Sequence, residues 1–201
     1  MSSRETILGS IRSHLAASPP FHPSESVFTP ASPPTTSVVE LFKQNVEAVD
    51  GHCAVVNNEE ELTRILENFT ARKIAISDAP LLNRLGITPS NSNIFEIDVG
   101  ITTAQAAIAE TGTLVLDSSR ERNRLVSLVP PVHIAIVDAS SIFQTLGEAL
   151  EFIHRDGNIS PAVTFITGPS RTADIELTLA IGVHGPQELY VIVNEGAPLT
   201  R

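Results

Sequence analysis

The chain has 201 residues, 42% of them hydrophobic, a formal net charge of −10 and a single cysteine, Cys53. This length supports one domain with a core of its own, one thiol excludes both an intrachain disulfide and a four-thiolate iron–sulfur site, and the spacing of the six histidines predicts no metal site. The acidic charge disfavours general binding to nucleic acid, and no apolar stretch approaches the roughly 20 residues that a membrane span needs.

An N-terminal helix is the first expected element. Ser2 or Ser3 can cap it, and Glu5 stands three positions after Ser2, as a capping box requires. Its apolar stripe consists of Ile7, Leu8, Ile11 and Leu15. No apolar signal-peptide core follows the first residues, so we expect the protein in the cytoplasm.

A proline-rich arm follows between Ala17 and Ser37. The six prolines of this stretch favour extended backbone, and its only charged residue is Glu25. The sequence therefore predicts two parts, a helix with an arm over residues 1–37 and an α/β domain over residues 38–201.

Helices and strands alternate through the first half of this domain. The expected elements are a helix from Val38 that Gly51 ends, a strand at Cys53–Val56, a helix capped by Asn58, and strands at Lys73–Ser77 and Ile94–Ile97. Such alternation is typical of a mainly parallel sheet with helices on its faces.

The second half repeats the alternation. Strands are expected at Gly112–Asp117, His133–Val137, Ala162–Thr167 and Leu189–Val193, with a helix from Ser141 whose capping box includes Gln144. Thr172–Ile181 is ambiguous, because its apolar residues alternate as in a strand. The preceding Gly168-Pro169-Ser170 resembles a strand-to-helix turn, and we expect a helix there.

Several common catalytic and nucleotide-binding motifs are missing. The chain has no G-x-G-x-x-G, no G-x-x-x-x-G-K-[ST] and no G-x-S-x-G. The usual dinucleotide, P-loop and hydrolase interpretations therefore lose their main support.

A polar interruption at Glu110-Thr111-Gly112-Thr113 breaks an apolar stretch. It is either a tight connection between two strands, which uses the permissive backbone of Gly112, or the lining of a pocket at the sheet edge. Arg120 follows as one of three arginines within six residues. These arginines form either a solvated loop or a positive patch that grips a phosphate or carboxylate.

A second polar stretch begins at Gly168, where a strand ends. If a helix begins here, its free N–H groups favour an anion, to which Ser170 and Thr172 would add hydroxyls and Arg171 a full charge. Capping alone would explain Ser170, but not a cation in the first turn of a helix. His184 lies in a later turn and is either structural or part of this site.

Three segments resemble the LUD domain of the lactate-utilisation protein C family, and the resemblance extends from about Val38 to the C-terminus. They are Ala109–Leu116, Leu128–Ile134 and Thr167–Glu176, the last followed by Gly182–Pro186. The resemblance implies a three-layer α/β sandwich like that of the NagB/RpiA/CoA-transferase superfamily. It also implies a role in oxidising L-lactate to pyruvate beside iron–sulfur partner proteins, with no cofactor in this chain.

The resemblance assigns no catalytic residue, so the candidates rest on local chemistry and motif position. Candidate catalytic carboxylates are Glu110, Asp174 and Glu176. Candidate anion-binding residues are Thr111, Gly112, Thr113, Arg120, Gly168, Ser170, Arg171, Thr172 and His184. The alternative function is a stand-alone enzyme of CoA-transferase-like fold that acts on a small phosphorylated or carboxylate substrate, an analogy of fold alone.

Overall fold

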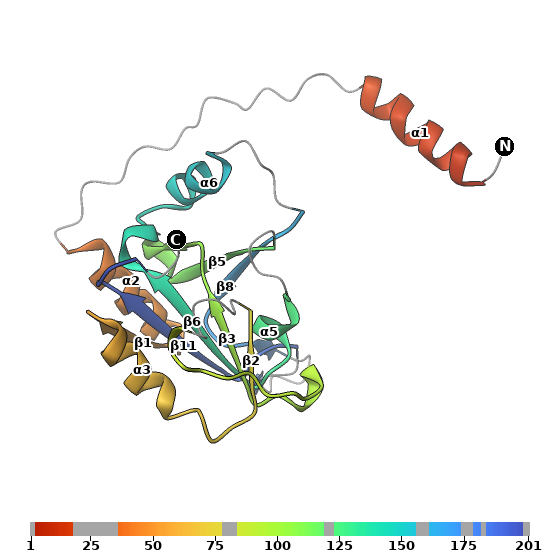
Figure 1. Cartoon of the computed structure of the whole chain (residues 1–201). Helices are drawn as coiled ribbons and strands as arrows, with labels where there is room; N and C mark the ends of the chain where they lie inside the picture. Colours follow the sequence, from red (N-terminus) through yellow and green to blue (C-terminus); the bar gives the residue numbers. More distant parts are fainter. Residues whose placement is uncertain are drawn as a thin grey trace. The chain divides into compact units, whose positions relative to one another are not determined.

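The computed structural model divides the chain into two units, Met1–Pro34 and Thr35–Arg201 (Figure 1). It describes residues 3–17, 36–77, 84–118, 123–155, 161–173, 179–181 and 184–198. In the first unit, α1 (Ser3–Ala17) confirms the expected N-terminal helix, with Ile7 and Leu8 exposed. Most of the expected arm, residues 18–35, lies outside the described residues. Among the described helices, none is long and apolar enough to cross a membrane.

A five-stranded sheet organises the second unit. Its order is β1 (His52–Val56), β11 (Glu188–Asn194), β6 (Val132–Asp138), β3 (Val99–Thr103) and β2 (Ile74–Ile76). Every neighbouring pair is parallel, which confirms the predicted sheet. β11 and β6 are buried along most of their length, and a parallel strand covered on both faces is expected to be this apolar.

Two capped helices lie against opposite faces of this sheet. In α2 (Val38–Ala48), the side chain of Ser37 accepts a hydrogen bond from the Glu40 N–H. In α3 (Glu59–Glu67), Asn58 accepts from the Glu61 N–H, as predicted. Leu62 and Leu66 of α3 pack on the face that carries Ile101 and Ile134. Phe42 and Val46 of α2 pack on the face that carries Ala135, Val137 and Val191.

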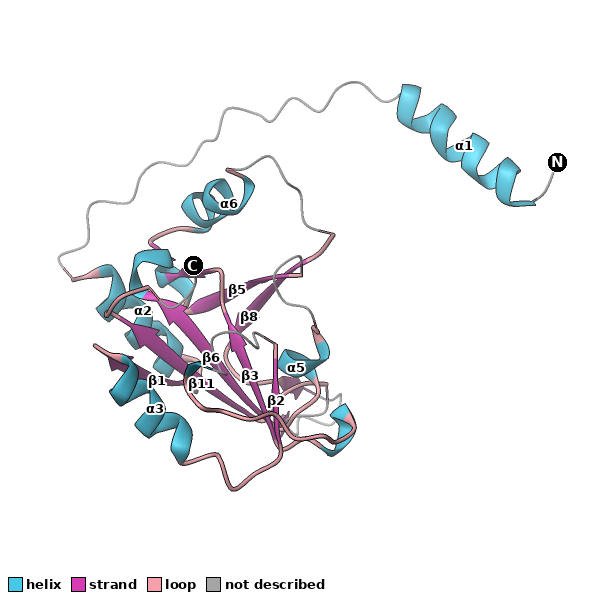
Figure 2. Ribbon diagram, in the orientation of Figure 1, coloured by secondary structure: helices cyan, strands magenta, loops and turns pink. Residues whose placement is uncertain are grey.

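A smaller, mixed sheet shares the α2 face. Its order is β7 (Ile142–Phe143), β4 (Ala106–Ile108), β5 (Thr113–Asp117) and β8 (Val163–Thr167). Leu114 and Leu116 join the core beneath α2, while Ala106 and Val115 pack toward α6 (Leu146–His154). The layers are thus α3, the parallel sheet, then α2 with the smaller sheet, and α6 outside it (Figure 2). This arrangement confirms the expected α/β class with a mainly parallel sheet.

Two predicted elements are wrong because local polar residues control the backbone. Ile94–Glu96 is a 3₁₀ turn, not a strand, and the side chain of Asn93 accepts a hydrogen bond from the Phe95 N–H. The strand comes later, at β3, where small and polar residues conceal it. The helix expected from Ser141 begins at Leu146 instead, because Thr145 and Glu148 form the capping box.

The helix expected at Thr172–Ile181 is also wrong. Arg171–Ala173 (β9) pairs antiparallel with Leu179–Ile181 (β10), and residues 174–178 between them lie outside the described residues. The alternation of apolar residues, with its period of two, was the correct signal, and the preceding glycine turn was not followed by a helix.

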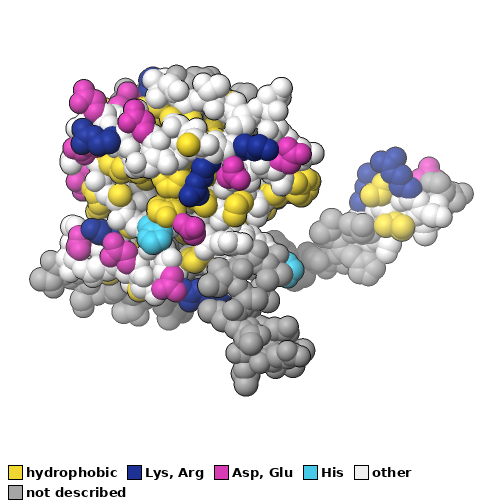
Figure 3. Space-filling model, turned by 90° about the horizontal axis from the view of Figure 1, so that it is seen from below, with side chains coloured by type: hydrophobic (Ala, Val, Ile, Leu, Met, Phe, Trp, Pro, Cys, Tyr) yellow, Lys and Arg dark blue, Asp and Glu magenta, His cyan; other side chains and the backbone are white. Residues whose placement is uncertain are grey.

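Apolar side chains also reach the surface of the second unit. Figure 3 shows them gathered across one face, with charged side chains on either side. Phe95 is 77% exposed, and Leu125 and Leu128 of the short helix α5 (Leu125–Leu128) are 44% and 41% exposed. The surface of this unit is therefore not uniformly polar despite its acidic charge.

Candidate functional site

The two polar stretches singled out in the sequence lie side by side. β5 pairs antiparallel with β8, and this register places Thr113 opposite Thr167. Their hydroxyl oxygens are 2.7 Å apart, and the hydroxyl oxygen of Thr111 lies 2.7 Å from that of Thr113. Thr113 is buried, whereas Thr111 and Thr167 are exposed. The three hydroxyls thus form a row with the buried Thr113 at its centre, and the exposed hydroxyl at each end can still donate or accept a hydrogen bond.

The glycines of both stretches bring the backbone against α2. Gly112 has φ +62° and Gly168 has φ +70°. A Cβ on Gly112 would lie 2.5 Å from the carbonyl carbon of Asn45, and a Cβ on Gly168 would lie 2.5 Å from the Val49 oxygen. Asn45 also donates to the Ala109 carbonyl over 2.7 Å. Gly112 therefore serves the tight connection between β4 and β5, the simpler of its two interpretations.

Arg171 lies at the C-terminal end of α2. Its guanidinium forms an ion pair with Asp50 and donates to the Val49 carbonyl over 3.4 Å. A cation at a helix C-terminus is favourable, because free carbonyls point toward it. The helix N-terminus that was expected to favour an anion is absent here, since Arg171 belongs to the strand β9. In the described part of the chain, the charge of Arg171 stabilises the C-terminal end of α2.

Glu110 forms hydrogen bonds at the start of α6. One carboxylate oxygen accepts from the Leu146 N–H over 3.1 Å, and the Glu110 N–H donates to the Gln144 carbonyl over 3.1 Å. A carboxylate at the first free N–H groups of a helix stabilises that helix. The side chain is exposed, so this contact leaves part of the carboxylate accessible.

We expect Glu110→Ala to lower the free energy of unfolding by about 1 kcal/mol, the typical cost of losing a helix cap. Urea unfolding followed by circular dichroism measures this difference. Glu151→Ala, on the exposed side of the same helix, is the matched control and should change the stability far less. Equal losses in the two variants would show that Glu110 does not cap α6.

The remaining predicted residues divide into two groups. The Ser170 N–H donates to the Pro186 carbonyl over 2.8 Å, so the turn that carries the exposed His184 lies beside the second polar stretch. Thr172 pairs with Ala180 in the β9–β10 hairpin. Arg120, Asp174 and Glu176 lie outside the described residues.

A buried polar pair lies at the carboxyl edge of the parallel sheet and was not among the residues predicted from the sequence. Asn194 donates from Nδ2 to Asp138 Oδ1 over 2.8 Å and to the Ala197 carbonyl over 2.9 Å, and its Oδ1 accepts from the Gly196 N–H. Asp138 and Asn194 end β6 and β11 side by side. Ligands of open α/β sheets bind at this edge. The sequence did contain a signal for this pair, because each of the two apolar strands ends with a polar residue.

His133 is completely buried in β6. Its Nε2 lies 2.8 Å from the Thr102 hydroxyl, and Nδ1 has no hydrogen-bond partner among the described residues. Burial lowers the pKa of His133 from 6.5 to about 4, because the interior disfavours the charged ring. His133 is thus a neutral ring in the core of the second unit.

Cys53 has the chemistry of a structural thiol. Burial, and then the negative charge of Glu47, raise the pKa of its thiol to about 12. A thiol in this state is a poor nucleophile and a poor metal ligand. Among the described residues, no group of three His, Cys, Asp or Glu side chains is arranged to hold a metal ion.

Comparison with known proteins gives consistent results. The model of the LUD domain family matches residues 90–193. Lactate utilization protein C 1 of Bacillus mycoides is 43% identical over 191 residues, covering 78% of this chain and 80% of its own. An uncharacterised protein of Neisseria meningitidis serogroup B is 48% identical over 97 residues, covering 48% of this chain. The match spans only 42% of that relative's length.

A solved structure shares the fold. The crystal structure of a DUF162 family protein from Deinococcus radiodurans matches 78% of this chain and 96% of its own, with a TM-score of 0.60 and 27% identity. The family match covers the hydroxyl row, both α2-facing glycines and Asp138, and it ends one residue before Asn194, the partner of Asp138. The chain belongs to the LUD domain family, and among its relatives are proteins named lactate utilization protein C.

Proposed function

We propose that this chain is a component of a system that oxidises L-lactate to pyruvate together with iron–sulfur partner proteins. The observation that carries the proposal is the 43% identity to a lactate utilization protein C over 80% of that protein's length. The similarity extends beyond the family segment, so it covers more than a shared core.

The chemistry of the reaction calls for an electron-accepting partner, and the resemblance to the lactate-utilisation family implies that this partner is an iron–sulfur protein. Conversion of lactate to pyruvate releases two electrons and two protons, and the electrons need an acceptor. One thiol with a pKa of about 12 cannot hold an iron–sulfur cluster. Clusters in partner proteins would take the electrons, and this chain would contribute binding or positioning.

A small-anion site is the finer part of the proposal. Lactate and pyruvate carry a carboxylate, which hydroxyls and a guanidinium recognise well. The glycines that follow Thr111 and Thr167 pack against Asn45 of α2 and against Val49 at its C-terminal end, and the 39%-exposed side chain of Arg171 pairs with Asp50 just after that helix. Arg120, Ser170, Thr172 and His184 stay candidates for the same site, and Glu110, Asp174 and Glu176 for its acid–base chemistry.

Calorimetric titration with pyruvate and with lactate tests this site. We expect Arg171→Ala to abolish binding, whereas Asp50→Asn should strengthen it several-fold, because the guanidinium then loses a competing carboxylate. Arg64→Ala, an exposed arginine on α3, is the control for a general loss of charge. Unchanged affinity in Arg171→Ala would remove this residue from the site without affecting the role in lactate oxidation.

Purification of the tagged chain from its own cells, grown on lactate, tests the main proposal. We expect a coloured complex that contains cysteine-rich proteins and reduces a dye when L-lactate is added. A colourless chain that is purified alone, with no lactate-dependent dye reduction, would contradict the proposal. It would favour the alternative, a stand-alone enzyme for a small phosphorylated or carboxylate substrate.

A further inference from the structure

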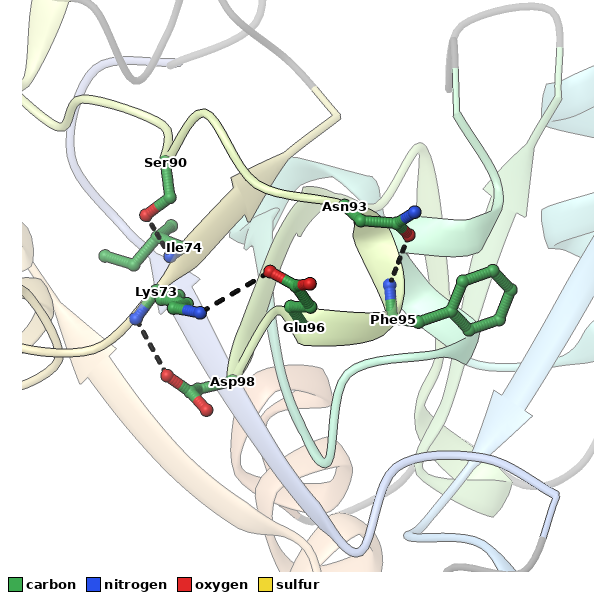
Figure 4. A network of polar contacts seen from close by, with 7 residues as sticks. All are labelled: Lys73, Ile74, Ser90, Asn93, Phe95, Glu96 and Asp98. Atoms are coloured by element: carbon green, nitrogen blue, oxygen red, sulfur yellow. Dashed lines mark hydrogen bonds and ion pairs between the residues drawn. The ribbon is translucent and has the colours of Figure 1, made fainter.

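The two edge strands of the parallel sheet differ in whether their outward-facing backbone groups have hydrogen-bond partners. At β2 a loop closes the edge, because the Ile74 N–H donates to the Ser90 hydroxyl over 3.0 Å and the Ser90 N–H donates to the Ile74 carbonyl over 2.8 Å. The preceding residue, Lys73, faces β3 instead: its N–H donates to Asp98, its carbonyl accepts from the Val99 N–H, and its ammonium lies 3.6 Å from Glu96 (Figure 4). Covering of an edge by a loop blocks unwanted strand addition.

At β1, the opposite edge, the backbone is open. The Glu195 N–H donates to the Val56 carbonyl, so Val56 points its backbone groups toward β11. Alternate residues of a strand point to opposite sides, and the N–H and C=O groups of Cys53 and Val55 therefore point outward. In the described part of the chain these four groups have no partner, and Cys53 and Val55 are partly exposed.

This open edge is short and limited at both ends. The Gly51 N–H already donates to the Val46 carbonyl, and Val56 is engaged with β11. Ala54, the residue between the two outward-facing ones, has the smallest side chain of the strand. A hollow of about 240 Å³ lies on the α3 side, lined by His52, Ala54, Phe69 and Tyr190 among others. Its walls are mainly apolar, so covering this edge would also remove apolar surface from water.

A second copy of this chain fits the edge better than an unrelated strand. Two β1 strands related by a two-fold axis at Ala54 run antiparallel, with Cys53 opposite Val55 of the other copy. Each such pair exchanges two N–H···O bonds, so all four outward groups of each copy are satisfied. A longer foreign strand would keep unpaired groups of its own, whereas the second copy presents an edge of the same length. The small side chain of Ala54 permits the close approach at the axis.

We propose that two copies associate through β1, antiparallel about Ala54, to form one continuous ten-stranded sheet. This proposal does not depend on the role in lactate oxidation. The net charge of −10 on each chain opposes the association. Added salt screens that repulsion and leaves backbone hydrogen bonds and apolar contacts largely intact, so dimerisation should strengthen as the salt concentration rises.

Light scattering coupled to size exclusion, on the full chain over a range of concentrations and salt, gives the first test. We expect a species of twice the 21.5-kDa chain mass. Ala54→Lys places two ammonium groups at the axis and should give monomers with an unchanged circular dichroism spectrum. Asn68→Lys adds the same charge on the exposed end of α3 and should stay dimeric. A wild-type monomer at all concentrations and salt levels would overturn the proposal.

Cysteine cross-linking tests the register. In a non-hydrogen-bonded antiparallel pair the Cα atoms are about 4.5 Å apart, within the range that a disulfide spans. Only the residue on the axis faces its own copy. In a Cys53→Ala background, Ala54→Cys should therefore form a covalent dimer on mild oxidation, and His52→Cys should not. A dimer in which Ala54→Cys fails to cross-link, or both variants cross-link equally, would exclude this pairing.

Discussion

Substitution of Gly112 by alanine is expected to lower the free energy of unfolding by about 3 kcal/mol or more. Two costs add. A left-handed backbone at φ +62° costs an alanine about 1 kcal/mol, and the new Cβ would lie 2.5 Å from backbone atoms of Asn45 and Val46. Overpacking of this kind typically costs about 1–3 kcal/mol, and here α2 must move, because the atoms met belong to its backbone.

Urea unfolding of Gly112→Ala measures this loss. Gly147→Ala is the matched control, because Gly147 lies in α6 without a positive φ, and a Cβ there would meet only the Thr145 hydroxyl oxygen, at an ordinary contact distance of 3.9 Å. It should be neutral or slightly stabilising, since alanine is the better helix former. If Gly112→Ala were as stable as the wild type, the close packing of this turn on α2 would be incorrect. Loss of ligand binding without loss of stability would instead assign Gly112 to a binding pocket.

The second large effect is a loss of stability in acid that depends on His133. Its pKa is 6.5 when unfolded and about 4 when folded, so the unfolded chain takes up a proton at a higher pH. Above pH 6.5 the ring is neutral in both states and the free energy of unfolding is at its full value. As the pH falls from 6.5 toward 4, the unfolded chain binds a proton that the folded chain does not, and the free energy of unfolding decreases. Each pKa unit corresponds to 1.36 kcal/mol, so the loss is about 3 kcal/mol in total.

The effect of His133 is isolated by measuring the free energy of unfolding of the wild type and of His133→Gln at pH 7 and at pH 4.5. The carboxylates that titrate near pH 4 are common to both proteins and cancel in the difference. We expect the variant to lose less stability than the wild type between the two pH values. His154→Gln, at an exposed position, should keep the full wild-type loss. Parallel losses in wild type and His133→Gln would show that His133 is not buried as a neutral ring.

Local signals predicted most elements of the second unit. Asn58 caps α3 as expected, and the apolar runs at Cys53–Val56, His133–Val137 and Leu189–Val193 are strands. These predictions succeeded because caps and apolar runs act over a few residues. β3 was missed because Gly100 and two threonines break the apolar pattern. Gly100 is required there, since a Cβ would lie 1.9 Å from the Val126 carbonyl oxygen of a distant segment.

The candidate site depended on contacts that sequence patterns do not contain. The β5–β8 register brings Thr113 and Thr167 together across 54 positions of sequence. Arg171 seemed out of place in a helix, and its partner Asp50 lies far away in the chain. The permissive backbone of Gly112, in contrast, was predictable, because a single glycine between two apolar runs is a local signal. Long-range pairing thus decided which polar residues meet.

Growth on L-lactate of cells that lack this chain tests the central claim most directly. The proposed role predicts that such cells fail to grow on L-lactate as the carbon source but grow normally on pyruvate, and that the wild-type chain restores growth. Normal growth on L-lactate, with no second lactate-oxidising activity in the extracts, would contradict a role in lactate oxidation.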